Sequence, residues 1–274
     1  MRVTVLCDNH ASGTAIGEHG LSILIEAGRN VLFDVGPGSS TCRNARLMDI
    51  ELYGVDYIVL SHGHCDHCGG LSRMAKEAVN ARLILHPETA LPRYSLSSGV
   101  PRYIGIPPSA KSVINQQTSD GTIIYVEKPL AIASSFTVFP VGGRDHHPVR
   151  DDFLRDTPDG IRETDMFRDE LGLLVEGNHS AALFTGCAHS GLIKTFETAG
   201  RLTSKPIKYI MGGSHLERAS KAEISEVADY FTEFDVELYL GHCTGIPGYA
   251  NLSAYLDEEQ LHPLSSGLVI DLKL

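Results

Sequence analysis

The first 35 residues consist of short apolar runs separated by polar and turn-forming residues. Residues 3–6, 21–25 and 31–34 are rich in aliphatic and β-branched side chains, and residues 27–30 (Ala-Gly-Arg-Asn) have the composition of a tight turn. Apolar runs of this length with Gly and Asn between them are typical of strands joined by hairpins. The pattern predicts a β-meander over residues 1–35.

Farther along the chain, apolar runs of strand length alternate with stretches of helical periodicity. Residues 69–81 have apolar side chains on one helical stripe, and residues 192–199 form a second such stretch that Gly200 should end. Ser220 and Glu223 have the spacing of a capping box before a third helix. Six further runs are expected to form strands: residues 55–60, 82–86, 171–175, 181–185, 207–211 and 236–240. We expect residues 171–175 and 181–185 to pair in a hairpin.

The region of about residues 87–165 is rich in Pro, Ser and Gly and has the weakest pattern, with strands expected near residues 121–126 and 136–141. Long irregular segments of compact enzymes are often lids or binding loops, so we expect a variable lid or insert here. Residues 142–147 contain Arg144 and two histidines. They form either a solvated loop or a substrate-facing loop whose Arg takes a carboxylate or phosphate in forked geometry.

The strongest chemical signal follows the strand expected at residues 55–60. His62, His64, Asp66 and His67 lie within six residues, just where that strand ends. Packing explains such a cluster poorly, because Asp is almost never buried without a partner, and the alternative is a His-rich polar loop. The spacing suits two metal positions, one for His62 and His64 and one for Asp66 and His67. Imidazole and carboxylate ligands are compatible with Zn, Mn or Fe.

Three further histidines also stand at expected strand ends. His189, His215 and His242 follow the runs 181–185, 207–211 and 236–240. One such histidine would be unremarkable, but three are better explained by convergence on the first cluster. Asp34 also ends a strand, where it either orients a ligating imidazole through its second ring nitrogen or is an ordinary turn residue.

Composition agrees with one compact domain over residues 1–274. Hydrophobic residues make up 42% of the chain, and 23 Lys and Arg against 34 Asp and Glu give a net charge of −11. An acidic surface argues against nucleic-acid and membrane partners, which require basic patches. We therefore expect a small-molecule substrate, which can still be anionic if it is held locally.

The cysteines and the beginning of the chain bear on the compartment. No run approaches the ~20 apolar residues of a membrane span, and a strand pattern starts at once without a signal-peptide layout. We therefore expect a cytoplasmic protein whose six cysteines are thiols. Cys65 and Cys68 form a C-x-x-C that could be a redox pair, but two expected ligands interrupt it, which favours a packing role.

His-x-His-x-Asp-His after an apolar strand resembles the signature of the metallo-β-lactamase superfamily. The resemblance implies an α/β fold, the four-layer αβ/βα sandwich with a one- or two-metal site between its sheets. Further motifs resemble the branch named for dihydropterin or ribofuranosyl-aminobenzene phosphate synthase activity. They are Gly-Leu-Ser-x-Leu-Ile-Glu (20–26), Leu-Phe-Asp (32–34), Ser-His-Gly-His (61–64), Gly-Cys-x-His-x-Gly (186–191), Gly-Gly-x-His-Leu (212–216) and His-Cys-Thr-Gly (242–245).

The resemblance also implies roles for individual residues. His62 and His64 would hold the first metal, Asp66 and His67 the second, and His242 matches the last ligand of the superfamily. The sequence departs from the superfamily pattern at two places. Cys187 stands in Thr-Gly-Cys where the superfamily has a bridging carboxylate in Thr-Gly-Asp. No His lies just before residues 171–175, where the middle ligand of the superfamily would fall, so His189 is the candidate substitute. Cys187 is either a thiolate ligand or a buried thiol.

Three functions remain open. The first is a metal-dependent hydrolase in which a metal, Zn before Mn or Fe, lowers the pKa of coordinated water to ~7 for attack on an ester, phosphoester or related bond. The second is a pterin-linked transferase with a pterin-like substrate, as the branch name implies, and the third is a non-catalytic metal- or ligand-binding module. The catalytic candidates are Asp66 and His215, with His215 as a proton donor, a substrate contact or a support for the ligands. The oligomeric state stays open.

Overall fold

The computed structural model describes residues 1–143 and 152–274, which form two large mixed sheets and one small sheet. The first sheet has the strand order β18 (Val269–Asp271), β1 (Arg2–Cys7), β2 (Ser22–Glu26), β3 (Asn30–Phe33), β4 (Tyr57–Val59), β5 (Arg82–Leu85), β8 (Ile124–Tyr125). The second has the order β17 (Leu261–Pro263), β16 (Glu237–Gly241), β15 (Ile207–Gly213), β14 (Ala181–Thr185), β13 (Leu171–Glu176), β10 (Phe136–Pro140), β9 (Leu130–Ala133).

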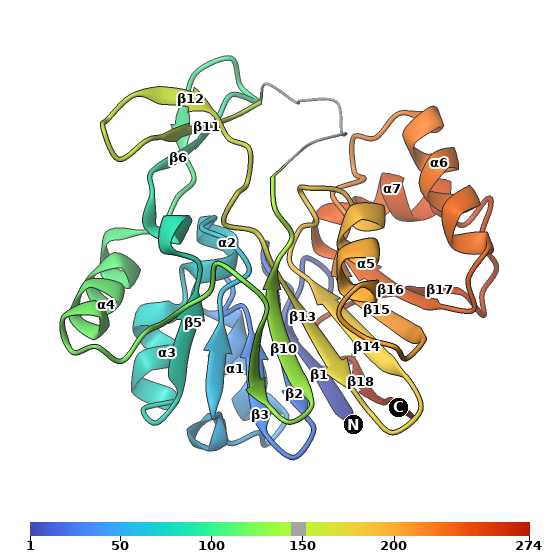
Figure 1. Cartoon of the computed structure of the whole chain (residues 1–274), viewed down its shortest axis with the longest axis horizontal. Helices are drawn as coiled ribbons and strands as arrows, with labels where there is room; N and C mark the ends of the chain where they lie inside the picture. The colour runs from blue at the N-terminus through green and yellow to red at the C-terminus, as the bar shows by residue number, and fades with distance from the viewer. Residues whose placement is uncertain (144–151) are drawn as a thin grey trace.

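Helices cover the outer face of each large sheet (Figure 1). One side is covered by α1 (Ser40–Leu47), α3 (Leu71–Glu77) and α4 (Pro108–Ser119), and the other by α5 (Leu192–Gly200), α6 (Lys221–Thr232) and α7 (Gly245–Leu252). The short helices are α2 (Cys65–Cys68), η1 (Leu52–Gly54), η2 (Pro87–Ala90) and η3 (His242–Thr244).

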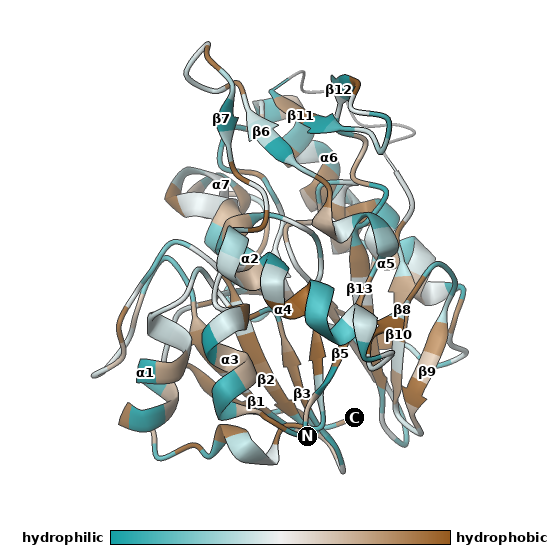
Figure 2. Ribbon diagram, turned by 90° about the vertical axis from the view of Figure 1, so that its left-hand side faces the viewer, coloured by the Kyte–Doolittle hydropathy of each residue, from teal (hydrophilic) through white to brown (hydrophobic). Residues whose placement is uncertain are grey.

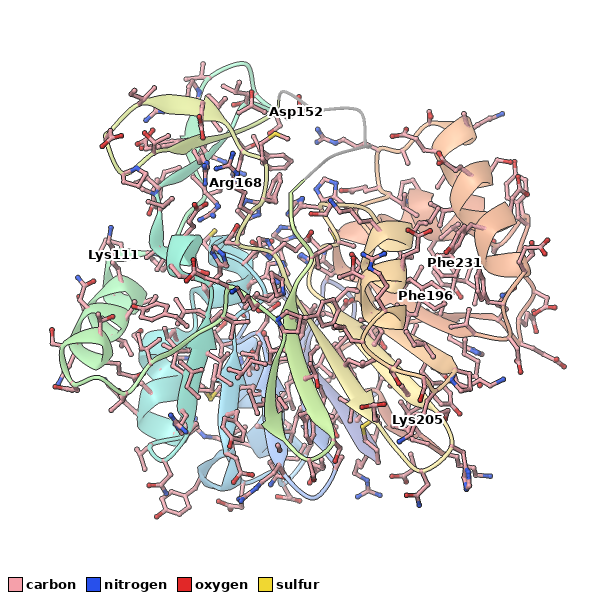
Figure 3. The ribbon with its side chains drawn as sticks, in the orientation of Figure 1. Lys111, Asp152, Arg168, Phe196, Lys205 and Phe231 are labelled. Atoms are coloured by element: carbon pink, nitrogen blue, oxygen red, sulfur yellow. The ribbon has the colours of Figure 1, made fainter. Side chains whose placement is uncertain are left out.

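Three buried apolar clusters define the layers. One lies between the two sheets, and the other two lie between each sheet and its helices. In the outer layer of the second sheet, Phe196 of α5 and Phe231 of α6 pack with ring centroids 5.3 Å apart (Figure 3). Figure 2 shows the hydrophobic residues concentrated along the strands, with hydrophilic ones on α3 and α4. The four-layer αβ/βα sandwich expected from the sequence is confirmed.

A third, small sheet lies over one end of the sandwich (Figures 1 and 2). Its strand order is β12 (Arg162–Thr164), β11 (Phe153–Asp156), β6 (Arg93–Ser95), β7 (Arg102–Tyr103). The region of about residues 87–165 is thus divided, because α4 and β8 to β10 belong to the sandwich. The loop at residues 142–147, predicted to be either solvated or substrate-facing, lies, from residue 144 onward, outside the described residues.

The local predictions hold in most places. The meander of β1, β2 and β3 and the hairpin of β13 and β14 are both antiparallel pairs, and the capping box of Ser220 and Glu223 is present. The helix expected over residues 69–81 is present as α3 but is shorter, and the separate short helix α2 precedes it. No helix among residues 1–143 and 152–274 is long and apolar enough to cross a membrane.

Candidate metal centre

Strand ends from both sheets deliver the candidate ligands to one place. The loop after β4 contains His62 and His64, while His189 and His242 follow β14 and β16. Because β14, β15 and β16 run parallel, their carboxyl ends share one edge of the sheet. Clefts at such edges are where open α/β sheets bind ligands.

The first cluster consists of His62, His64 and His189. Their ligand atoms lie within 4.8 Å of one another, and the residues are 0%, 5% and 3% exposed. Burial lowers the pKa of both His62 and His64 well below the usual value, so these imidazoles are neutral at neutral pH. Within the described part of the chain, the buried Nε2 atoms of His62 and His64 have no hydrogen-bond partner. Since buried polar nitrogens are normally paired, this orphaned pair fits a metal ion.

The second cluster consists of Asp66, His67 and His242, whose ligand atoms also lie within 4.8 Å of one another. The Nε2 atoms of His67 and His242 are 3.0 Å apart, and Nε2 of His242 lies 3.4 Å from Oδ2 of Asp66. Two nitrogen ligands about 2.0 Å from a tetrahedral zinc ion would lie about 3.3 Å apart. The observed spacings therefore suit one shared cation.

Cys187 lies between the two clusters. Its Sγ is 3.1 Å from Nε2 of His67, and it groups both with His62 and His67 and with His242 and Cys243. The sequence placed this thiol at the position of a bridging ligand, and the geometry puts it within reach of both clusters. Burial raises the pKa of Cys187 well above the usual value, so the thiol is protonated as long as no cation is nearby.

Hydrogen bonds fix the second ring nitrogen of three imidazoles. Nδ1 of His67 lies 2.6 Å from Oδ2 of Asp34, which confirms the orienting contact expected for that acid. Nδ1 of His62 lies 2.9 Å from Oγ of Ser61, and Nδ1 of His242 lies 2.9 Å from Oδ1 of Asn9. All three Nε2 atoms are thereby left to face the cluster, as metal sites require.

Two carboxylates that the sequence analysis missed complete the surroundings. Glu170, directly before β13, accepts the backbone N–H groups of His189 and Ser190 at 2.5 and 2.8 Å. Asp8 accepts the N–H of His242 at 2.7 Å, and burial raises the pKa of Asp8 to about 6. Only the general preference for polar residues at strand ends could have indicated them.

Backbone strain is concentrated at the same place. Asp34, Phe167, Ala188, His215 and His242 have positive φ values of 59°, 50°, 51°, 54° and 48°. Non-glycine residues pay a conformational cost in this left-handed region, and such residues gather at functional sites. The sequence carries no marker for them, because none is a glycine.

A cavity of about 380 Å³ opens beside the clusters. The small sheet contributes Phe153 and Arg102 to its lining, and His64, His215 and Arg218 line it from the sandwich. Figure 3 places Asp152, another lining residue, at the small sheet above the ends of the large sheets. The small sheet therefore forms one wall of the cavity.

His215 borders the first cluster. Its ring centroid is 4.5 Å from that of His189, and its backbone N–H donates to Sγ of Cys243 at 3.2 Å. His19, which the sequence analysis missed, also lines the cavity, with Nε2 3.2 Å from Oδ2 of Asp66. The structure thus brings together all eight predicted site residues.

The cysteines match the expectation of thiols, because all six are free. Cys68 is buried and donates to the carbonyl oxygen of His64 at 2.8 Å, and burial raises its pKa well above the usual value. A buried, protonated thiol of this kind supports packing and not redox exchange.

This constellation is typical of one superfamily, and the sequence comparison agrees. A profile described as the metallo-beta-lactamase superfamily matches residues 15–191. That match covers more than half of the chain, so the chain belongs to this superfamily. Its members are mostly metal-dependent hydrolases that bind divalent metals.

Relatives extend over nearly the whole chain. An uncharacterized protein of Methanocaldococcus jannaschii is 34% identical over 254 residues, which cover 92% of this chain and 93% of that protein. The 7,8-dihydropterin-6-methyl-4-(beta-D-ribofuranosyl)-aminobenzene-5'-phosphate synthase of the same organism is 24% identical over 268 residues, covering 92% and 90%. The crystal structure of Tm1679, a metal-dependent hydrolase of the beta-lactamase superfamily, has a TM-score of 0.85 at 28% identity and 99% coverage of both chains.

Proposed function

We propose that this protein is a two-metal hydrolase acting on a small molecule with an ester, phosphoester or related bond. The observation that carries the proposal is the pair of adjacent ligand clusters, each with ligand atoms within 4.8 Å of one another, beside a cavity. Divalent ions bound there would supply Lewis-acid chemistry and activate water near neutral pH.

Each cluster would hold one ion. His62, His64 and His189 would bind the first, and Asp66, His67 and His242 the second, with Cys187 between them. This assignment makes Asp66 a ligand, although the sequence also offered it as a catalytic group. Imidazole and thiolate together favour zinc, while manganese prefers oxygen ligands, so elemental analysis should find zinc before Mn or Fe.

The chain's own groups would bind and protonate the substrate. A cavity of about 380 Å³ has the size of a small-molecule site. Arg102 and Arg218 line it and could meet an anionic group. His215 borders both the cavity and the first cluster, so we assign to its imidazole the transfer of a proton to the leaving group.

The test is turnover by the zinc-loaded protein on a panel of phosphodiesters, carboxylic esters and thioesters. We expect hydrolysis of at least one class, and His215→Ala should lower that rate by about 10²–10⁴-fold without changing the metal content. His262→Ala is the control, because His262 on β17 pairs with Glu237 and does not line the cavity. Absence of turnover on the whole panel would contradict the proposal.

A pterin-linked transferase is the second candidate, favoured by the 24% identity to the dihydropterin-linked synthase over most of both chains. Incubation with a dihydropterin diphosphate and 4-aminobenzoate separates the two. A condensation product without hydrolysis of the panel favours the transferase. Tight metal binding without any product favours a non-catalytic binding module.

Asn9 offers a test of the second ion alone. It contacts His242 through Oδ1 at 2.9 Å and touches none of the first-cluster ligands. We expect Asn9→Ala to weaken binding of the second zinc equivalent by about 10–100-fold, as for other groups that orient ligands, and to leave the first equivalent unchanged. Asn9→Asp, which keeps an acceptor for Nδ1, should retain the affinity. Calorimetric titration with zinc measures both, and equal losses of both equivalents would count against the assignment.

A further inference from the structure

Arg93, on β6 of the small sheet, is completely buried with its charge compensated. Nε donates to Oδ2 of Asp165 at 2.9 Å, and Nη2 forms an ion pair with Oδ1 of Asp169 at 2.7 Å. The remaining donors reach carbonyl oxygens of Glu88, Thr89 and Leu91 at 3.3, 3.0 and 3.1 Å. Four hydrogen bonds and the ion pair with Asp169 thus give every nitrogen of the guanidinium a partner.

The carboxylate of Asp169 also contacts the loop that contains His62 and His64. Oδ2 of Asp169 accepts the backbone N–H of Gly63 at 2.8 Å, and Gly63 stands between His62 and His64. Gly63 also lies directly against the guanidinium of Arg93, because a Cβ at Gly63 would lie only 2.4 Å from Nη1 of Arg93. The backbone that carries two candidate ligands is thus held against the guanidinium.

The carboxylate of Asp165 is connected to His189 through Phe167. Oδ1 of Asp165 accepts the backbone N–H of Phe167 at 2.8 Å, at a residue with a φ of 50°. The Phe167 ring stacks on the His189 imidazole, with centroids 3.8 Å apart and planes inclined by 13°. Asp165 thereby fixes the surface against which the His189 ring lies.

We propose that Arg93 is a positioning residue for the three-histidine site, which it orients through Asp169 and Gly63 on one side and through Asp165 and Phe167 on the other. The small sheet would then act on the metal as well as forming a wall of the cavity. This inference rests on the proposed function, because it assumes that His62, His64 and His189 hold an ion.

The simpler alternative is that the buried ions only stabilise the fold, and Arg155 provides a matched control. Arg155 lies opposite Arg93 on β11, is 3% exposed and also pairs with two carboxylates, those of Glu88 and Glu163. Among residues 1–143 and 152–274, neither carboxylate forms a hydrogen bond or ion pair with the loop of residues 62–64 or with Phe167. Both arginines can be changed to lysine, which keeps the charge but has three donors in place of five.

The experiment compares Arg93→Lys with Arg155→Lys, by chelator competition for the first zinc equivalent and by the visible spectrum of the cobalt-loaded protein. Arg93→Lys should weaken the first equivalent by about 10–100-fold and alter the cobalt bands, and Arg155→Lys should change neither. Thermal unfolding of both metal-free variants measures any loss that is purely structural.

A second variant covers the case in which Arg93→Lys does not fold. Asp169 uses one oxygen for Arg93 and the other for Gly63, so Asp169→Asn, with a single oxygen, must give up one contact. It should show the same loss of first-site affinity. Wild-type affinity and cobalt bands in Asp169→Asn, or an equal affinity loss in Arg155→Lys, would overturn the inference.

Failure of the proposed function would look different. If the wild-type protein binds metal at the three histidines but hydrolyses nothing, the proposed hydrolase activity is wrong. The comparison of metal affinities between the Arg93 and Arg155 variants then remains valid. A wild-type protein that binds no metal there overturns both proposals.

Discussion

Changing His64 to alanine is expected to cost the protein the ion held by the first cluster. His64 is 5% exposed, its Nε2 faces His62 and His189, and the described chain provides no other partner for that atom. Loss of a group that only orients a ligand lowers metal affinity by up to about 100-fold. Loss of one of the three ligands themselves should lower the affinity of the first site by more than that. Elemental analysis should therefore fall from about two zinc equivalents to about one.

The same experiment separates the two clusters. His67→Ala should remove the other equivalent, and zinc should stabilise each variant against heat less than it stabilises the wild type, since a ligand stabilises only the state that binds it. His179→Ala is the control, because His179 is exposed in the turn between β13 and β14. Equal zinc contents in the His64 and His179 variants would mean that the metal is bound elsewhere.

The candidate ligand histidines could be predicted from sequence because each follows an apolar run. A buried strand is visible as such a run, and parallel strands bring their carboxyl ends to one edge. Because β14, β15 and β16 run parallel, His189, His215 and His242 follow strand ends at one edge of the second sheet, as the sequence pattern indicates. The spacing of residues 62–67 and the superfamily resemblance together suggested which of them would belong to which ion.

Apart from Asp34, the groups that orient these candidate ligands could not be predicted. Asn9 and His242 are 233 residues apart, and Asp169 reaches Gly63 across 106 residues. Contacts of this kind depend on the packing of two sheets and leave no local pattern. The same holds for Arg93, which in the sequence resembles any surface arginine.

The small sheet was missed for a different reason. Its strands have two to four residues, too few for an alternating pattern to be visible. Its central pairing joins Arg93 to Arg155, so the partner lies far along the chain. The helix α2 has only four residues and likewise shows no helical period, which is why a single later helix was expected.

The two ions are expected to differ in how their binding depends on pH. His62 and His64 are already neutral, because burial lowers the pKa of each well below its usual value. Burial alone would also lower the pKa of His67, but the carboxylates of Asp34 and Asp66 outweigh it and raise that pKa to about 9. Burial also keeps the Cys187 thiol protonated. A cation in the second cluster must therefore displace protons that a cation in the first does not.

Between about pH 6.5 and 8.5 the affinity for the second zinc equivalent should therefore rise with pH. The expected rise is about 10-fold per pH unit if binding displaces one proton and about 100-fold if it displaces two. The first equivalent should change by less than about threefold over the same range. Calorimetry in buffers of different ionisation enthalpy counts the protons directly. Equal proton release by both equivalents would contradict the assignment of His67 to the second ion.

The metal-free protein should show the opposite trend. A histidine whose pKa is raised in the folded state contributes stability that is fully present below its unfolded pKa of about 6.5 and is lost as the pH rises through its folded pKa. For His67 that folded value is about 9, so the melting temperature of the metal-free protein should fall between these limits. The zinc-induced rise in melting temperature should grow over the same interval, since binding then displaces fewer protons. In His67→Ala the fall should be smaller, and the difference from the wild type measures the contribution of this one imidazole.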